Sequence, residues 1–217
     1  MSGRVGNLVY VQSARYGPLV RAFSPPRNPQ TIPQQANRQS FGAVASQWRA
    51  LPPEKRVLWC LAAASLYVVN NVGRQVRLSG YHLHMRLNAA RAHLGLSRYE
   101  EPPSNVPPSF DPNPVDAVVV TNTDGDTQIK LHVSGPLAEH TLVEAAAPVS
   151  AGVSCVQQYR YTGLLPAPDN GYSDVTDLVV GRFGVLTPGK VLFLRIRQQI
   201  NGWMDVPKVL SVLIPAA

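Results

Sequence analysis

Apolar residues recur at two different spacings in the two halves of this chain. Between residues 32 and 97 they repeat every three or four positions, which is the period of amphipathic helices. Thr31 has the features of an N-cap for the first predicted helix, while Ser79 and Gly95 bound the third. We expect the second helix, almost wholly apolar after Arg56, to be the most buried. The residues predicted to pack the helices together are Phe41, Val44, Trp48, Leu58, Trp59, Leu61, Leu83 and Leu87.

From residue 114 onward the apolar residues alternate with polar ones, which is typical of half-buried strands. Turn clusters separate seven strand-like runs, at residues 115–121, 127–134, 141–147, 157–162, 175–182, 190–199 and 206–214. Seven short strands over about a hundred residues predict an antiparallel β-sandwich. In strand number and rhythm this half resembles a fibronectin type III or immunoglobulin-like module, although it lacks the Cys-Trp-Cys hallmark.

The opening segment has a different pattern. Two β-rich runs, residues 5–12 and 19–23, are joined by a short connection that contains Gly17, which predicts a β-hairpin. A lone two-stranded hairpin is marginal in water, so its apolar face needs a surface to cover it. We expect this apolar face to consist of Val5, Leu8, Tyr10, Val20 and Phe23. The contact with another copy should also include Arg15, Tyr16, Arg21 and Arg27.

These patterns together predict an α+β chain with four parts. They are an arm with a β-hairpin at residues 1–31, a three-helix domain at 32–97, a Pro-rich linker at 98–113, and a seven-stranded sandwich at 114–217. The linker contains five prolines and no periodicity, so we expect an extended, semi-rigid spacer.

Charge is distributed unevenly over the 217 residues, whose net charge is +7. Residues 1–98 carry thirteen Lys or Arg against one acid, a net charge of +12, whereas residues 99–217 carry seven bases and twelve acids, a net charge of −5. Such polarity indicates either a nucleic-acid partner for the basic half or copies that meet basic half to acidic half.

No group of residues has the pattern of a catalytic, cofactor or metal site, so we predict a protein that is not an enzyme and uses no cofactor. Asp124 and Asp126 alternate as in calcium loops, but the further ligands are missing, and a hairpin turn is the better interpretation. His82 and His84 lie two apart on a predicted helix and point in nearly opposite directions, which indicates a surface or core-edge pair.

The two cysteines, Cys60 and Cys155, lack metal-ligand spacing and are predicted to be buried, reduced thiols, with a disulfide as the less favoured alternative. The N-terminus lacks the apolar region of a signal peptide, and the longest apolar run, residues 57–69, is too short to span a bilayer. We therefore expect synthesis in the cytoplasm, no membrane insertion, and a final location in a virion or an extracellular assembly.

Three motifs resemble those of a family of uncharacterised proteins encoded in bacterial and phage-like genomes. They are the opening Gly3-Arg-Val-Gly-Asn-Leu-Val-Tyr, the helix start Pro26-Arg-Asn-Pro-Gln-Thr-Ile-Pro-Gln-Gln, and the pair Trp48 and Trp59. The resemblance covers the N-terminal half and implies neither an activity nor site residues.

Two hypotheses of function follow. The first is a non-enzymatic structural subunit of a phage-like virion or tail, or of a filament, which binds copies of itself through its basic arm and helices and displays the β-sandwich. Other structural proteins of the assembly are its further candidate partners. The alternative is a nucleic-acid-binding accessory protein, in which Arg15, Arg21 and Arg27 of the basic half contact phosphates.

Overall fold

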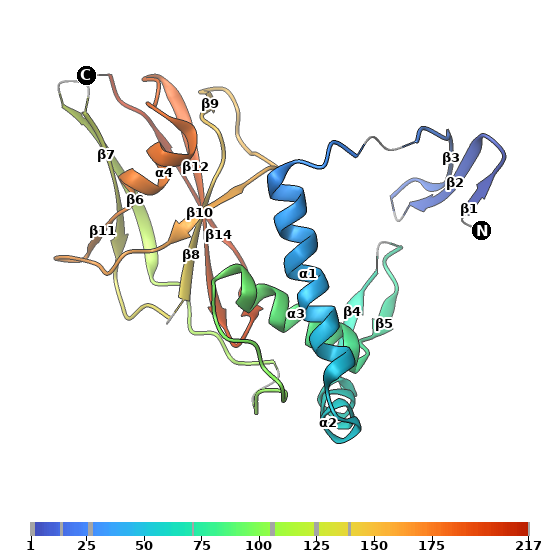
Figure 1. The fold of residues 1–217 in the computed structure, drawn as a ribbon. Coiled ribbons are helices and arrows are strands. Elements are labelled where there is room, and N and C mark those ends of the chain that lie inside the picture. Colours follow the sequence, from blue (N-terminus) through green and yellow to red (C-terminus); the bar gives the residue numbers. More distant parts are fainter. Residues whose placement is uncertain are drawn as a thin grey trace. The chain divides into compact units, whose positions relative to one another are not determined.

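The fold was analysed in a computed structural model, which describes residues 3–13, 15–25, 28–70, 72–104, 107–123, 126–138 and 140–216. The chain forms two compact units, Met1–Val106 (unit 1) and Pro107–Ala217 (unit 2), and the division falls within the predicted linker. Helices and antiparallel sheets make the fold mixed α+β, as predicted (Figure 1).

The arm, residues 3–25, is a three-stranded antiparallel sheet and not the two-stranded hairpin predicted. Its strands are β1 (Gly3–Val5), β2 (Leu8–Ser13) and β3 (Gly17–Ala22), in the order β1-β2-β3. The predicted run 5–12 is interrupted because Gly6 and Asn7 form a two-residue turn, in which Gly6 has a φ of 58°. A glycine at the first central position is typical of the type II′ turns that join neighbouring strands.

Three helices and a second hairpin form the rest of unit 1. The helices are α1 (Ile32–Ala50), α2 (Pro53–Ala63) and α3 (Gly80–His93), and the hairpin consists of β4 (Tyr67–Val69) and β5 (Gln75–Arg77). Prolines occupy the first turn of both α1 and α2, where a missing N–H costs nothing. The Ser79 hydroxyl accepts a hydrogen bond from the His82 N–H, which confirms the predicted cap of α3.

The packing of unit 1 confirms some of the predicted helical contacts and contradicts others. Both α1 and α2 pack against α3, and Val44, Trp59, Leu83 and Leu87 are fully buried there. The prediction that α2 is the most buried helix is wrong, because α2 meets α3 along one side only and buries Trp59 and Ala63. Three predicted packing residues are exposed instead: Phe41 by 58%, Leu58 by 43% and Leu61 by 66%.

Unit 2 contains two antiparallel sheets that share one hydrophobic core. The smaller sheet has the order β11-β7-β6, formed by β6 (Val115–Thr123), β7 (Asp126–Val133) and β11 (Tyr172–Asp174). The larger, six-stranded sheet comprises β8 (His140–Ala145), β9 (Val149–Ser150), β10 (Arg160–Leu164), β12 (Lys190–Ile200), β13 (Trp203–Met204) and β14 (Lys208–Leu213). In that sheet β8 pairs with β10 and β12, and β14 pairs with β12. Ile129 and Leu131 of the smaller sheet and Leu194 and Ile196 of the larger one belong to the common core.

One predicted strand of unit 2 is a helix. Residues 175–182 read as a β-rich run, but the structure forms α4 (Thr176–Phe183) there. Val175 and Val179, four residues apart, are both buried in the core, so the helical period was present but masked by β-branched residues. The Thr176 hydroxyl accepts a hydrogen bond from the Ile129 N–H at 2.9 Å, which joins the start of α4 to β7.

Gly80 sets how closely α2 and α3 can approach. A Cβ at Gly80 would lie 2.7 Å from the Cys60 nitrogen and 2.9 Å from its Cα, so Gly80→Ala must push the helices apart. We expect it to lower the free energy of unfolding by about 1–3 kcal/mol, measured by urea denaturation. A Cβ at Gly42 of α1 would meet nothing within 4 Å. Gly42→Ala should therefore raise the free energy of unfolding by roughly 0.5–1 kcal/mol. Equal effects of the two substitutions would contradict the close approach.

Candidate self-association surface

Strand register divides the arm into two faces of different chemistry. Tyr10 pairs with both Gly3 and Val20, Leu8 pairs with Val5 and Ala22, and Gln12 pairs with Pro18. Paired residues lie on the same face of a sheet. One face of the arm is therefore uncharged and mainly apolar. This surface, face A, consists of Val5, Leu8, Tyr10, Gln12, Pro18, Val20 and Ala22.

The opposite face, face B, combines apolar and cationic side chains. Arg4 pairs with Val9, which in turn pairs with Arg21, and the next pair toward the β2–β3 turn is Val11 with Leu19. The Arg4 guanidinium lies 3.6 Å from the centroid of the Phe23 ring. Phe23 therefore belongs with Arg4 on face B, and the prediction that it shares a face with Val5, Leu8, Tyr10 and Val20 is wrong. Arg4, Arg21 and Phe23 line a hollow of about 550 Å³.

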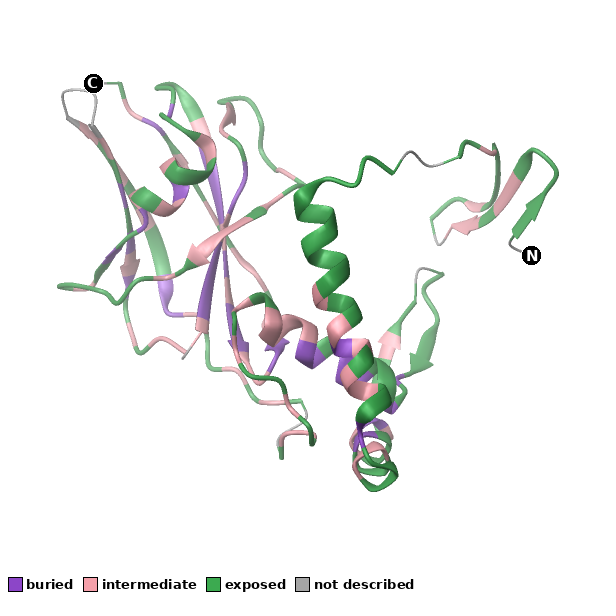
Figure 2. Cartoon of the chain, viewed as in Figure 1, coloured by how far each residue is buried: buried purple, intermediate pink, exposed green. Residues whose placement is uncertain are grey.

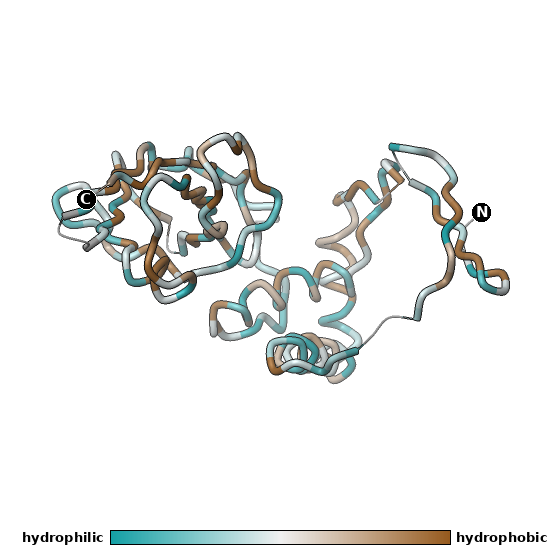
Figure 3. The backbone as a smooth tube through the Cα atoms, turned by 90° about the horizontal axis from the view of Figure 1, so that it is seen from above, coloured by the Kyte–Doolittle hydropathy of each residue, from teal (hydrophilic) through white to brown (hydrophobic). Residues whose placement is uncertain are grey.

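Face A is exposed to solvent over most of its area. Val5 is 67% exposed, Val20 55% and Leu8 43%, while Tyr10 on the central strand is half-buried. Among residues 3–13 and 15–25 the structure buries none (Figure 2). Figure 3 shows hydrophobic residues recurring along these strands. Contiguous exposed apolar surface of this kind makes face A a candidate interaction site.

The remaining predicted arm residues lie at the tip or outside the described residues. Tyr16 is 66% exposed, and the Arg15 guanidinium lies 5.3 Å from the centroid of its ring. Gly17, with a φ of 71°, completes the β2–β3 turn. Arg27 lies outside the residues that the structure describes.

A buried histidine occupies the centre of the helical packing, although the sequence indicated only a surface or core-edge pair. The His84 ring lies 5.0 Å from the Trp59 ring and 5.3 Å from the Trp48 ring, between centroids. His84 is fully buried, and neither ring nitrogen has a hydrogen-bond partner among the residues that the structure describes. Burial, with a smaller contribution from the positive charge of Arg98, lowers the pKa of His84 to about 4.

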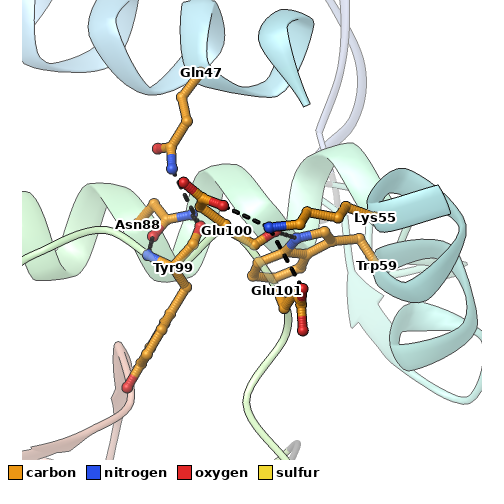
Figure 4. A network of polar contacts seen from close by, with 7 residues as sticks. All are labelled: Gln47, Lys55, Trp59, Asn88, Tyr99, Glu100 and Glu101. Carbon is orange, nitrogen blue, oxygen red and sulfur yellow. Dashed lines mark hydrogen bonds and ion pairs between the residues drawn. The ribbon is translucent and has the colours of Figure 1, made fainter. Parts of the chain in front are cut away.

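A short segment without helix or strand, residues 97–101, ties the three helices together, and we call it the clasp. The Asn88 side chain of α3 donates to the Tyr99 carbonyl at 3.1 Å and accepts from the Tyr99 N–H at 2.6 Å. Gln47 of α1 donates to the same carbonyl at 3.3 Å, and Trp59 of α2 donates to the Glu100 carbonyl at 2.8 Å (Figure 4). Sequence reasoning missed the clasp because it placed residues 98–113 in a spacer.

Ion pairs add to the clasp on its solvent side. Lys55 of α2 lies 2.5 Å from a Glu100 carboxylate oxygen and 3.4 Å from one of Glu101 (Figure 4). The hydrogen bond between Lys55 and Glu100 lowers the pKa of the Glu100 carboxyl and raises the pKa of the Lys55 amine. Both glutamates are largely exposed, so these pairs contribute little to stability.

One acid–histidine pair of unit 2 resembles part of a catalytic site. His132 Nδ1 lies 2.6 Å from Asp116 Oδ1, and this hydrogen bond lowers the pKa of Asp116. The Ser134 hydroxyl donates to the Pro114 carbonyl at 2.9 Å, so it is not directed at the imidazole. Tyr172 packs edge-on against His132. The pair links β6 to β7 in the smaller sheet, and this structural role explains the contact without a catalytic one.

The candidate ligand residues are not gathered into a metal site. Within the described parts of the chain, no group of three or more His, Cys, Asp or Glu could hold a metal ion. Cys60 and Cys155 are both free and exposed, so the prediction that they are buried is wrong. Asp124 lies outside the described residues, while Asp126 begins β7.

Searches for related proteins bring no match. No family model, no curated protein and no solved structure is significantly similar to this chain. No helix in the described ranges combines the length and apolar character needed to cross a bilayer.

The buried imidazole predicts an acid-sensitive unit 1. The unfolded chain binds a proton at His84 near pH 6.5, whereas the folded chain binds it only near pH 4, so stability falls as the pH drops between these values. His84 should lower the free energy of unfolding by at most about 3 kcal/mol over this pH range. Denaturation followed through the indole NMR signals of Trp48 and Trp59 measures it, and His84→Leu should flatten the profile over this window. An unchanged slope in that variant would show that other groups cause the acid sensitivity.

Proposed function

We propose that this chain is a non-enzymatic structural subunit that assembles with copies of itself through face A of the arm. The observation that carries the proposal is the exposure of an uncharged apolar sheet face, with Val5, Leu8 and Val20 between 43% and 67% exposed. The motif resemblance to proteins of phage-like genomes favours a virion, tail or filament as the assembly.

The physical reason lies in the stability of small sheets. A three-stranded sheet needs a hydrophobic face that is covered, or a helix packed on it, to be stable. None of the described residues among 3–25 is buried, so no part of the described chain covers the hydrophobic face of the arm. Contact with a second copy would bury face A and so supply the cover that the arm lacks.

The finer prediction for unit 2, a seven-stranded fibronectin type III or immunoglobulin-like module, belongs to the same proposal. Seven strands of described unit 2 are longer than two residues: β6, β7, β8, β10, β11, β12 and β14. Numbered one to seven, they pair as 1-2-5 in one sheet and 4-3-6-7 in the other. The immunoglobulin constant-type order differs only in the place of strand four. This order supports a displayed sandwich, with α4 inserted between strands five and six.

Paired substitutions at neighbouring positions test the proposal. Val20 lies on face A and is 55% exposed, whereas Leu19 lies on face B and is 44% exposed. Val20→Lys places a charge in the proposed interface and should shift the protein toward monomer in sedimentation velocity. Leu19→Lys adds the same charge to the same strand and should leave the assembly in place. A wild-type protein that is monomeric at every concentration and salt would contradict the proposal.

Binding to nucleic acid is the second candidate, favoured by face B. Residues 1–106 carry thirteen bases and three acids, so most of these bases have no acid in the unit to pair with. On face B, Arg4, Arg21 and Phe23 bring cationic and aromatic groups together around one hollow. Such combinations bind phosphates and stack on bases.

This candidate predicts affinity for single-stranded oligonucleotides that falls steeply with salt, measured by fluorescence anisotropy. Arg4→Ala combined with Arg21→Ala should reduce both the affinity and its salt dependence. Val20→Lys on face A serves as the control, because it should not weaken this binding. A salt-independent signal would exclude the candidate.

A further inference from the structure

Helix α2 leaves an apolar stripe uncovered on the side away from α3. Val57 is 55% exposed, Leu58 43% and Leu61 66%, and Glu54 at the start of the helix continues the same stripe. Residues spaced by three, four and seven positions share one face of a helix. Single exposed apolar residues are ordinary, but a row of them on one helix face indicates a partner.

Acidic residues gather near the start of α2, where the stripe begins. The sequence of residues 1–106 contains only three acids, Glu54, Glu100 and Glu101, and all three lie at the start of α2. Glu54 is on the helix itself, while Glu100 and Glu101 approach Lys55 next to it, with side chains 66% and 59% exposed. The three carboxylates outnumber Lys55 and Arg56 at this end of the helix.

The arm has the complementary character. Residues 1–53 contain no acid, and the arm is positively charged, with Arg4 and Arg21 on face B and Arg15 at the tip. Complementary charges steer two surfaces together, and the apolar faces then bury each other. We infer that the α2 stripe of one copy is the surface on which face A of another copy docks. This inference rests on the proposed self-association of the arm.

The chain length between the two surfaces favours a second copy over the arm of the same copy. Residues 24–31 join the arm to α1, and eight extended residues span at most about 26–29 Å. Helix α1 has 19 residues and is about 28 Å long, and α2 begins only after its C-terminal end. The connection would be stretched to its full length before the arm of the same copy reached the first turn of α2.

This geometry has a consequence for the form of the assembly. An arm that binds a different surface on its neighbour makes a heterologous contact. Such contacts repeat from copy to copy and produce a ring or a filament. The inference therefore predicts open or cyclic chains of copies, and not a closed dimer joined arm to arm.

Disulfide trapping between two populations tests the inference. Both populations carry Cys60→Ser and Cys155→Ser, since these thiols are exposed. One population then carries Val20→Cys on face A, and the other carries Leu61→Cys on the α2 stripe. After mixing and mild oxidation, a covalent pair of unlike chains should form, identified on non-reducing gels and by mass spectrometry of the linked peptides. The matched control is Leu19→Cys, on face B of the same strand, which should give at least a tenfold lower yield.

Two results would overturn the inference. One is an equal yield from Val20→Cys and Leu19→Cys. The other is a chain with both Val20→Cys and Leu61→Cys that forms only an internal disulfide when diluted, because the arm would then bind its own helix.

Leu61→Lys separates this inference from the proposed function. Leu61 is 66% exposed, so the fold tolerates the change, and thermal unfolding verifies this. Loss of assembly in both Leu61→Lys and Val20→Lys supports the inference. If only Val20→Lys disperses the assembly, the arm still joins the copies but its partner surface is not α2. If neither variant differs from the wild type, both the inference and the proposed role of face A are wrong.

Discussion

The hydrogen bonds between the clasp and the three helices are the interaction on which unit 1 depends. Helices α1 and α2 each pack on α3, and the Tyr99 and Glu100 carbonyls accept hydrogen bonds from Gln47, Asn88 and Trp59 of all three helices. Because the Trp59 indole is held by the clasp and by His84, α2 is fixed with that side inward. Its opposite side, which contains Leu58 and Leu61, is then left in solvent. A polar contact thus determines which apolar side of α2 remains exposed.

The arm shows the same principle in a sheet. Adjacent residues of a strand point to opposite faces, so one register places Val20 on an uncharged face and Arg21 on a cationic one. The two faces suit different partners, an apolar protein surface for face A and an anionic one for face B. Both proposed functions therefore arise from one small element, and they can be separated by substitutions at neighbouring positions.

Unit 2 differs from unit 1 in the way it is stabilised. Its two sheets and α4 share one core that includes Val115, Leu131, Val179 and Leu194, all fully buried. The surface pair of Asp116 and His132 only reinforces the pairing of β6 with β7. A unit with a complete core suits a displayed module, whereas the two surfaces proposed for self-association, face A and the α2 stripe, lie in unit 1. The division of labour in the proposed subunit follows from this contrast.

Local features were predictable from the sequence because they depend on neighbouring residues. The apolar period and the capping residues identified α1 and α3, alternation identified most strands of unit 2, and the uneven charge pointed to a partner. Face A could be predicted in part, since Val5, Leu8, Tyr10 and Val20 were all named. Only the tertiary structure decided that Phe23 lies on the other face, that His84 is buried, and that Leu61 is exposed. These outcomes depend on strand register and on helices and a clasp far apart in the chain, which local patterns do not encode.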